Sequence, residues 1–162
     1  QIDKSIDEIS HVAKITREAL SEVRQAVSGY KAKDPQAEID KAFARLIDGN
    51  FTVTQQVLLQ NLTAKAESSI LLIIREAITN ILRHSNGNNV IAKTQQTEDS
   101  LCLTICDNGS HYRDENATPQ FSNGLIGIVE RVKELNGQFT ISTEQGFELS
   151  ISLPNEVFIN EK

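Results

Sequence analysis

The sequence predicts a two-layer α/β sandwich, a mixed sheet with helices on one face, preceded by a long bundle-forming helix. Three observations predict it. Residues 1–30 space their apolar side chains alternately four and three apart, as in a bundled helix. Residues 65–85 form an apolar segment long enough for a buried helix. Short strand-like segments surround that helix in pairs separated by turn residues, and such a mixture is typical of an α/β fold.

Composition describes a globular chain and argues against two kinds of partner. The chain has 162 residues, of which 39% are hydrophobic and 23% charged, and its net charge is −6. A negative chain is poorly suited to nucleic acid or to an anionic membrane. No apolar run approaches the roughly 20 residues that span a bilayer. We therefore expect no binding to nucleic acid and no bilayer-spanning segment in these residues.

The two cysteines, Cys102 and Cys106, lie in one expected strand. Their separation of four residues corresponds to about 13 Å along a strand. A disulfide requires Cα atoms within about 7 Å, so the two cannot pair with each other. We expect two buried thiols, as in a reducing compartment.

The first half of the chain is expected to alternate helix and strand. The heptad pattern of residues 1–30 carries a wide apolar stripe, which needs partner helices from another chain. It begins without a capping residue, so we expect a piece of a longer protein. A linker, "SGYKAKDPQ", follows, then a short helix "QAEIDKAFARLIDGN" that ends at Gly49, and a strand "FTVTQQV".

The second half predicts one long helix, two hairpins and a further helix. The helix over 65–85 is ended by Gly87, and a hairpin follows that turns at Glu98 and Asp99. Residues 108–123 are polar and aperiodic, as in a lid over a ligand. The segment "GLIGIVERVKELNG" predicts a helix, and "QFTISTEQGFELSISLP" predicts a closing hairpin that turns at Gln145 and Gly146.

A polar line interrupts the apolar helix at "REAITNILRHS". Glu76, Asn80 and His84 follow one another at intervals of four residues and share one face, with Arg83 beside them. A solvated stripe is the simpler interpretation, but the neighbouring residues are apolar all round, and buried polar groups need partners. Asn80 could offer an oxygen to Mg²⁺, Glu76 could orient a water or accept a proton, and Arg83 and His84 could meet phosphate.

Two shorter motifs could complete a site. "DNG", Asp107 to Gly109, ends a strand and is by itself most simply a turn. Its carboxylate could alternatively accept a hydrogen bond from the exocyclic amine of adenine. "SNGLIG" opens a helix with Gly124 and Gly127, and such an N-terminus attracts phosphate, although many helices begin with glycine.

Together and in this order, the motifs resemble those of bacterial sensor histidine kinases, in particular the subgroup that works with response regulators bearing a helix-turn-helix output domain. "REAITNILRHS" is similar to the family's N-box, "DNG" to its adenine-binding Asp box, "NGLIGIVERV" to its second glycine box and "EQGFEL" to its closing glycine motif. The resemblance implies a Bergerat-type fold that binds ATP and Mg²⁺. It implies metal binding by Asn80 and a catalytic role for Glu76. The implied nucleotide-binding residues are Asn80, Arg83, His84, Asp107, Gly109, Asn123, Gly124, Leu125, Gly127 and Gly146.

Three positions depart from the family pattern. His111 replaces a glycine of the Asp box, as in members of the subgroup. Phe147 stands where the closing motif has Thr, which puts in doubt a hydroxyl contact near the adenine. The phosphoacceptor motif is missing, because Val12 follows His11 and no acid stands there. We interpret His11 as a bundle-edge histidine and not as the acceptor.

The resemblance implies the following organisation and activity. Residues 1–32 would be the second helix of the dimerisation domain, 33–157 the ATP-binding catalytic domain and 158–162 a tail. A neutral imidazole on a segment outside this chain would attack the γ-phosphorus of ATP. The partners implied are a response regulator with a helix-turn-helix output domain and, in the full-length protein, a second copy. The resemblance also implies the cytoplasmic portion of a membrane-anchored sensor, which reaches the membrane only through segments upstream of residue 1. The alternatives are a non-catalytic docking module with a degenerate pocket and another ATPase of the same fold.

Overall fold

The computed structural model describes residues 34–110, 123–144 and 146–159. The chain divides into two compact units, residues 1–31 and 32–162, and the described residues all belong to the second. Several predictions lie outside the described residues: the helix over 1–30, most of the linker, residues 111–122 of the predicted lid over 108–123, and the roles of His11 and His111.

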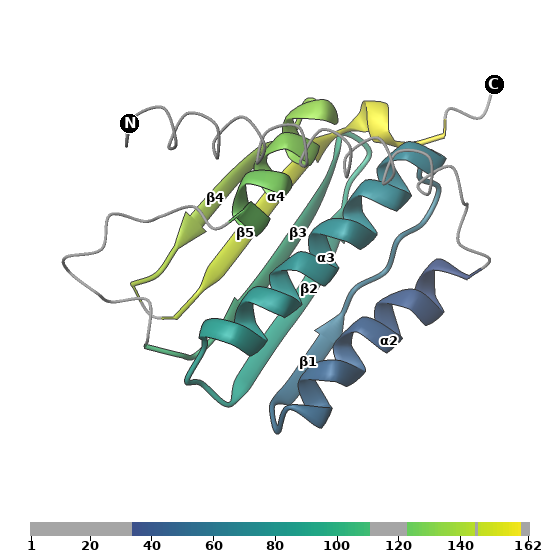
Figure 1. The fold of residues 1–162 in the computed structure, drawn as a ribbon. Helices are drawn as coiled ribbons and strands as arrows, with labels where there is room; N and C mark the ends of the chain where they lie inside the picture. Colours follow the sequence, from purple (N-terminus) through teal and green to yellow (C-terminus); the bar gives the residue numbers. More distant parts are fainter. Residues whose placement is uncertain (1–33, 111–122, 145, 160–162) are drawn as a thin grey trace, which may run out of the picture. The chain divides into compact units, whose positions relative to one another are not determined.

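A five-stranded mixed sheet forms one layer of the fold, in the order β1-β2-β3-β5-β4. β1 pairs with β2 in parallel, and the remaining neighbours are antiparallel. The described helices α2, α3 and α4 all lie on one face of this sheet (Figure 1). The predicted fold class is therefore confirmed. The described elements are α2 (Pro35–Asp48), β1 (Thr52–Gln56), α3 (Ala64–His84), β2 (Asn89–Gln96), β3 (Ser100–Asp107), α4 (Asn123–Glu134), β4 (Gln138–Ser142), β5 (Glu148–Pro154) and a 3₁₀ turn (Asn155–Val157).

Side chains at the ends of the helices fix where they begin and stop. The Asp34 carboxylate accepts a hydrogen bond from the backbone N–H of Ala37 at 3.1 Å and begins α2. The Thr63 hydroxyl caps α3 in the same way. After α2 and α4, the residues in the left-handed conformation are Asn50 and Asn136, which tolerate positive φ better than most side chains.

The core lies between the sheet and α3. Burial alternates along β3 and β5, so that every second side chain faces the helices. On α3 the buried apolar residues recur at helical spacing and face the sheet and the flanking helices, which places this helix in the middle of the layer. These residues are Ala66, Ile70, Leu71, Ile73, Ile74, Ala77, Ile78 and Ile81.

No helix in the described ranges is long and apolar enough to cross a bilayer.

The cysteines differ from prediction in their burial. Cys102 and Cys106 are free thiols, as expected, but both are only half-buried, because they fall on the sheet face opposite the described helices. Partial burial, and then the negative charge of Glu148, raise the pKa of the Cys106 thiol, so the neutral form is favoured there.

The end of the described chain is part of the fold. Residues 158 and 159 were expected to begin a tail. Phe158 instead forms a bridge with Leu62, and the N–H of Ile159 donates to the carbonyl of Asn61 at 2.7 Å.

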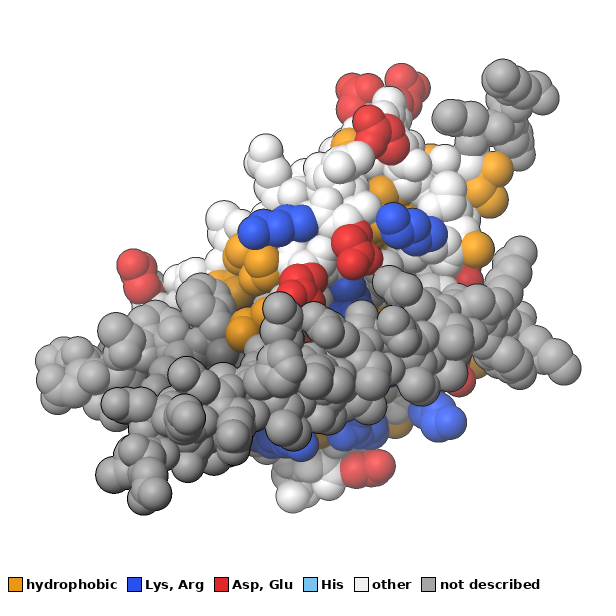
Figure 2. Space-filling view, turned by 45° about the horizontal axis from the view of Figure 1, so that its top comes forward, with side chains coloured by type: hydrophobic (Ala, Val, Ile, Leu, Met, Phe, Trp, Pro, Cys, Tyr) orange, Lys and Arg blue, Asp and Glu red, His pale blue; other side chains and the backbone are white. Residues whose placement is uncertain are grey.

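On the surface, acidic and basic side chains are interspersed over the described part of the face in Figure 2.

Candidate functional site

The predicted site residues come from α3, β3, α4 and the turn before β5. Three contacts bring these elements together. The Ser85 hydroxyl at the end of α3 bonds to Asp107 at the end of β3. A Cβ added at Gly124 of α4 would collide with the carboxylate of Glu76 on α3. A Cβ added at Gly146 would collide with the carbonyl oxygen of Asp107.

Asp107 is buried, with 6% of its surface exposed, and its two carboxylate oxygens have different surroundings. Oδ1 accepts a hydrogen bond from the Ser85 hydroxyl at 2.9 Å and another from the backbone N–H of Gly109 at 2.5 Å. Oδ2 is buried and has no hydrogen-bond partner among the described residues. Leaving a buried polar atom unpaired costs about 1–3 kcal/mol, so this oxygen is suited to a donor supplied by a ligand.

Asn80 is the second buried polar side chain among the described residues, at 6% exposed. Within the part of the chain that the structure describes, its Nδ2 atom has no hydrogen-bond partner. A half turn of the amide exchanges its nitrogen and oxygen, so the position can present an oxygen to a cation. Glu76 precedes it by one helical turn and is half-buried. The polar line therefore includes one buried amide with an atom free for a ligand.

Gly124 and Gly146 have specific steric reasons to be glycine. Gly124 lets the first turn of α4 approach the Glu76 carboxylate. Gly146 has φ 113°, a left-handed conformation that favours glycine, and it packs against the backbone of Asp107. Phe147 is 2% exposed and belongs to the core, and its carbonyl accepts the N–H of Asp107 at 2.9 Å. The backbone of the closing motif thus holds the end of β3.

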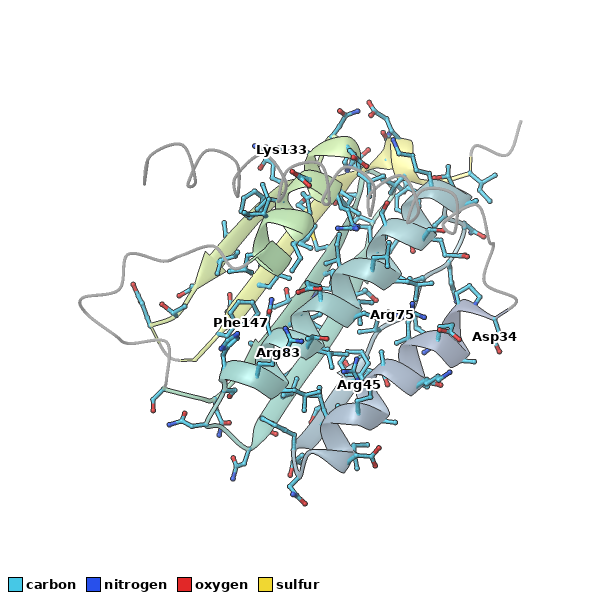
Figure 3. The ribbon with its side chains drawn as sticks, viewed as in Figure 1. Asp34, Arg45, Arg75, Arg83, Lys133 and Phe147 are labelled. Carbon is cyan, nitrogen blue, oxygen red and sulfur yellow. The ribbon has the colours of Figure 1, made fainter. Side chains whose placement is uncertain are left out.

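The remaining predicted residues are less tightly placed. Arg83 and His84 are exposed in the last turn of α3, and within the described ranges no hydrogen bond or ion pair holds either. Arg83 and Phe147 lie at the same end of the sandwich (Figure 3). Leu125 and Gly127 are half-buried in α4, and the carbonyl of Gly127 accepts from Arg131 Nη1 at 2.7 Å. Asn123 begins α4, and its side chain lies outside the described part of the structure.

Sequence reasoning missed the polar residues that support the site. Asn108 Oδ1 accepts the backbone N–H groups of Asn88 and Asn89, each at 2.9 Å. Asn86 Oδ1 accepts the N–H of Ser110 at 2.7 Å. These bonds fasten the connection between α3 and β2 to the chain that leaves β3. Their signal in the sequence is the asparagine-rich turn "SNGNN", in which only Gly87 was assigned a role, as the end of the helix.

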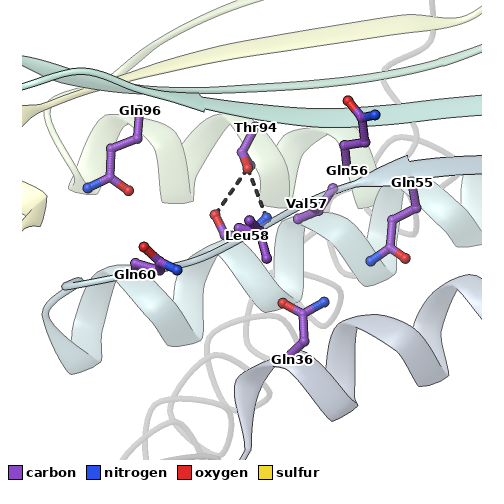
Figure 4. Close-up of a pocket in the computed structure, with 8 residues that line it drawn as sticks. All are labelled: Gln36, Gln55, Gln56, Val57, Leu58, Gln60, Thr94 and Gln96. Atoms are coloured by element: carbon purple, nitrogen blue, oxygen red, sulfur yellow. Dashed lines mark hydrogen bonds between the residues drawn. The ribbon is translucent and has the colours of Figure 1, made fainter.

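A separate hollow of about 580 Å³ lies where the chain leaves β1 (Figure 4). None of its lining residues belongs to the predicted site. Thr94 braces it, because its hydroxyl accepts the N–H of Leu58 at 2.9 Å and donates to the Leu58 carbonyl at 3.0 Å. The lining is Gln36, Gln55, Gln56, Val57, Leu58, Gln60, Thr94 and Gln96.

Comparison with known proteins agrees with this geometry. The family described as "Histidine kinase-like ATPase domain" matches residues 50–141. Sensor histidine kinase DesK of Bacillus subtilis is 29% identical over 156 residues, which cover 94% of this chain and 42% of DesK. The histidine-protein kinase/phosphatase UhpB of Salmonella typhimurium is 37% identical over 95 residues, covering 57% of this chain and 19% of UhpB. The chain thus spans less than half the length of these relatives.

Solved structures support the fold. The histidine kinase domain of the Erythrobacter litoralis EL346 blue-light activated kinase aligns with a TM-score of 0.63 at 18% identity, over 76% of this chain and 62% of that one. Acinetobacter baumannii histidine kinase AdeS aligns with a TM-score of 0.62 at 13% identity, over 90% of this chain and 81% of its own. Because the family match includes Asn80, Asp107 and Gly124 and covers more than half of the chain, this protein belongs to the histidine kinase-like ATPase domain family.

Proposed function

We propose that residues 33–157 are the ATP-binding catalytic domain of a sensor histidine kinase and that residues 1–32 are the second helix of its dimerisation domain. One observation carries the proposal. The two buried polar side chains of the described structure, Asn80 and Asp107, each keep one atom without a protein partner. Those atoms belong to the two motifs that resemble the magnesium-binding and adenine-binding boxes of the family.

Each residue has a defined role in this proposal. Asp107 Oδ2 accepts a hydrogen bond from the adenine amine, and Asn80 holds Mg²⁺, which supplies charge neutralisation at the phosphates. Glu76 orients a water or accepts a proton beside Asn80. Arg83, His84 and the N-terminus of α4 provide positive charge for the phosphate oxygens. Phosphoryl transfer depends mainly on such positioning and charge stabilisation.

The activity of the whole protein is also a proposal. The phosphate is transferred to a histidine on a segment outside this chain, and then to a response regulator with a helix-turn-helix output domain. The full-length protein is a homodimer, and this part of it lies on the cytoplasmic side of a membrane-anchored sensor. The retention of Asn80, Asp107 and the packed glycines favours an active pocket over a degenerate docking module.

Calorimetry with ADP or ATP and Mg²⁺ tests the proposal. The chain should bind, and removal of Mg²⁺ with a chelator should weaken binding. Asp107→Asn replaces an acceptor by a donor opposite the amine, and Asn80→Asp changes the metal position. Each variant should weaken binding at least tenfold, since a hydrogen bond to a charged group contributes about 1.5–3 kcal/mol. Asp99→Asn, in the exposed turn between β2 and β3, is the control. Absence of nucleotide binding by the unaltered chain would refute the function.

A further inference from the structure

We propose that Ser85 is a positioning residue that fixes the carboxylate of Asp107 and thereby makes the site select a purine with an amino group at position 6. This inference rests on the proposed function, since it concerns how the same site recognises its base. Ser85 was not among the residues that the motifs assigned, and its contribution appears only when α3 and β3 are seen together.

The backbone of Ser85 is held by the helix that it ends. It caps α3 with an extended conformation, φ −82° and ψ 135°, and its N–H donates to the carbonyl of Ile81 at 2.9 Å. The side chain is half-buried and points to the end of β3, where its oxygen would collide with a Cβ added at Gly109. The absence of a side chain at Gly109 therefore leaves the space in which the Ser85 hydroxyl lies beside Asp107.

The direction of the hydrogen bonds at Ser85 is fixed by the number of protons. The backbone N–H of Gly87 donates to Ser85 Oγ at 2.9 Å, so that contact uses an acceptor site of the hydroxyl. A hydroxyl has one proton to donate, and the other partner at 2.9 Å is Asp107 Oδ1. An ionised carboxylate only accepts. A directed chain results, from Gly87 N–H through the Ser85 hydroxyl to Asp107.

These hydrogen bonds give the two carboxylate oxygens of Asp107 different roles. Oδ1 receives donors from Ser85 and from the backbone of Gly109, both held by the fold, which opposes rotation of the carboxylate. Oδ2 remains buried and unpaired. A 6-amino purine supplies the missing donor, whereas a 6-oxo purine would bring a second acceptor against it. Sites whose buried polar groups require a partner reject ligands that lack it.

The test compares three nucleotides on the full chain by calorimetry in Mg²⁺: ADP, purine riboside diphosphate without a 6-substituent, and inosine diphosphate with a 6-oxo group. Ser85→Ala should weaken ADP binding roughly tenfold, as expected for loss of a charge-assisted hydrogen bond. The same substitution should change the affinity for purine riboside diphosphate by less than about twofold, because that ligand makes no bond to Oδ2. The ratio of the affinity for ADP to the affinity for inosine diphosphate should therefore be smaller in Ser85→Ala than in the unaltered chain.

Two further variants separate positioning from general damage. Ser85→Thr keeps the hydroxyl and should restore the preference for ADP. Ser100→Ala removes a hydroxyl at the other end of β3 and should change no affinity. Equal weakening of ADP and purine riboside diphosphate by Ser85→Ala, or no weakening of either, would overturn the role of Ser85 while leaving the proposed function intact. Failure of the unaltered chain to bind any of the three would overturn the function itself.

Discussion

Gly124 and Gly146 are both crowded, but by atoms of different kinds. The atom nearest to a Cβ at Gly124 is the carboxylate end of Glu76, which is a flexible side chain. At Gly146 it is the backbone carbonyl of Asp107, and φ is 113°. A side chain can move aside at little cost, whereas a backbone inside the sheet cannot. A side chain at Gly124 should therefore disturb the arrangement of the site, whereas a side chain at Gly146 should lower the stability of the fold.

Alanine at each position tests this difference. Gly146→Ala should destabilise the fold by about 1–3 kcal/mol, from the strained φ and the backbone clash. Gly124→Ala should change stability by less than about 0.5 kcal/mol but displace Glu76 and weaken Mg²⁺-ADP binding. Thermal unfolding followed by circular dichroism, with calorimetry for binding, measures both effects. Equal destabilisation by the two variants would contradict the distinction.

The site residues differ in how far sequence predicts them. Spacing along one helix predicted that Glu76 and Asn80 share a face, and a strand end followed by a turn singled out Asp107. Such relations are local and can be derived from helical and strand periods. Ser85 could not be identified in this way, because its partner lies 22 residues further along the chain. Whether a serine after a helix meets a carboxylate depends on where the next strands are packed.

At the scale of elements, periodicity predicted which of the described segments are helices and strands, and turn residues predicted both hairpins. The sheet order was not predictable. β1 pairs in parallel with β2 although α3 stands between them in sequence, and β5 lies between β3 and β4. Pairing between distant strands depends on the covering of apolar faces across the whole domain, which no local pattern records.

The edge of the sheet at β1 provides an element-scale prediction. Beyond Gln56 the chain leaves β2, and the Thr94 hydroxyl continues the attachment through both polar backbone groups of Leu58. Thr94→Val keeps the shape and loses both bonds, so it should destabilise the fold by about 1–2 kcal/mol. Urea unfolding measures the change, and amide hydrogen exchange should quicken at Leu58.

Thr94→Ser is the matched control for that experiment, because it retains the hydroxyl and loses only a methyl group. Its stability should lie closer to the unaltered chain than that of Thr94→Val. If the valine variant is as stable as the serine variant, the hydroxyl does not hold the edge, and the attachment of residues 57–60 depends on the burial of Val57 instead.

At the scale of the whole molecule, α3 carries more buried residues than any other described element, and the described helices cover one face of the sheet. α3 lies between α2 and α4 and carries nine of the buried residues, one of them Asn80. The opposite sheet face carries half-buried and exposed side chains such as Cys102 and Thr104. The helix that builds the core therefore also carries the polar line of the site, so damage to its packing reaches both stability and nucleotide binding.

Ile78 and Ile47 provide the matched test of this coupling. Ile78 on α3 is 0% exposed, between the site residues Glu76 and Asn80, whereas Ile47 on α2 is 61% exposed. Ile78→Ala should destabilise the fold by about 2–5 kcal/mol through lost burial and a cavity, and Ile47→Ala by less than about 0.5 kcal/mol. Both are measured by urea unfolding of the full chain. At temperatures where the Ile78 variant remains folded, its Mg²⁺-ADP affinity should still fall, because Ile78 packs the same helix that carries Asn80. Unchanged affinity in a folded Ile78→Ala protein would mean that core packing and the site are independent.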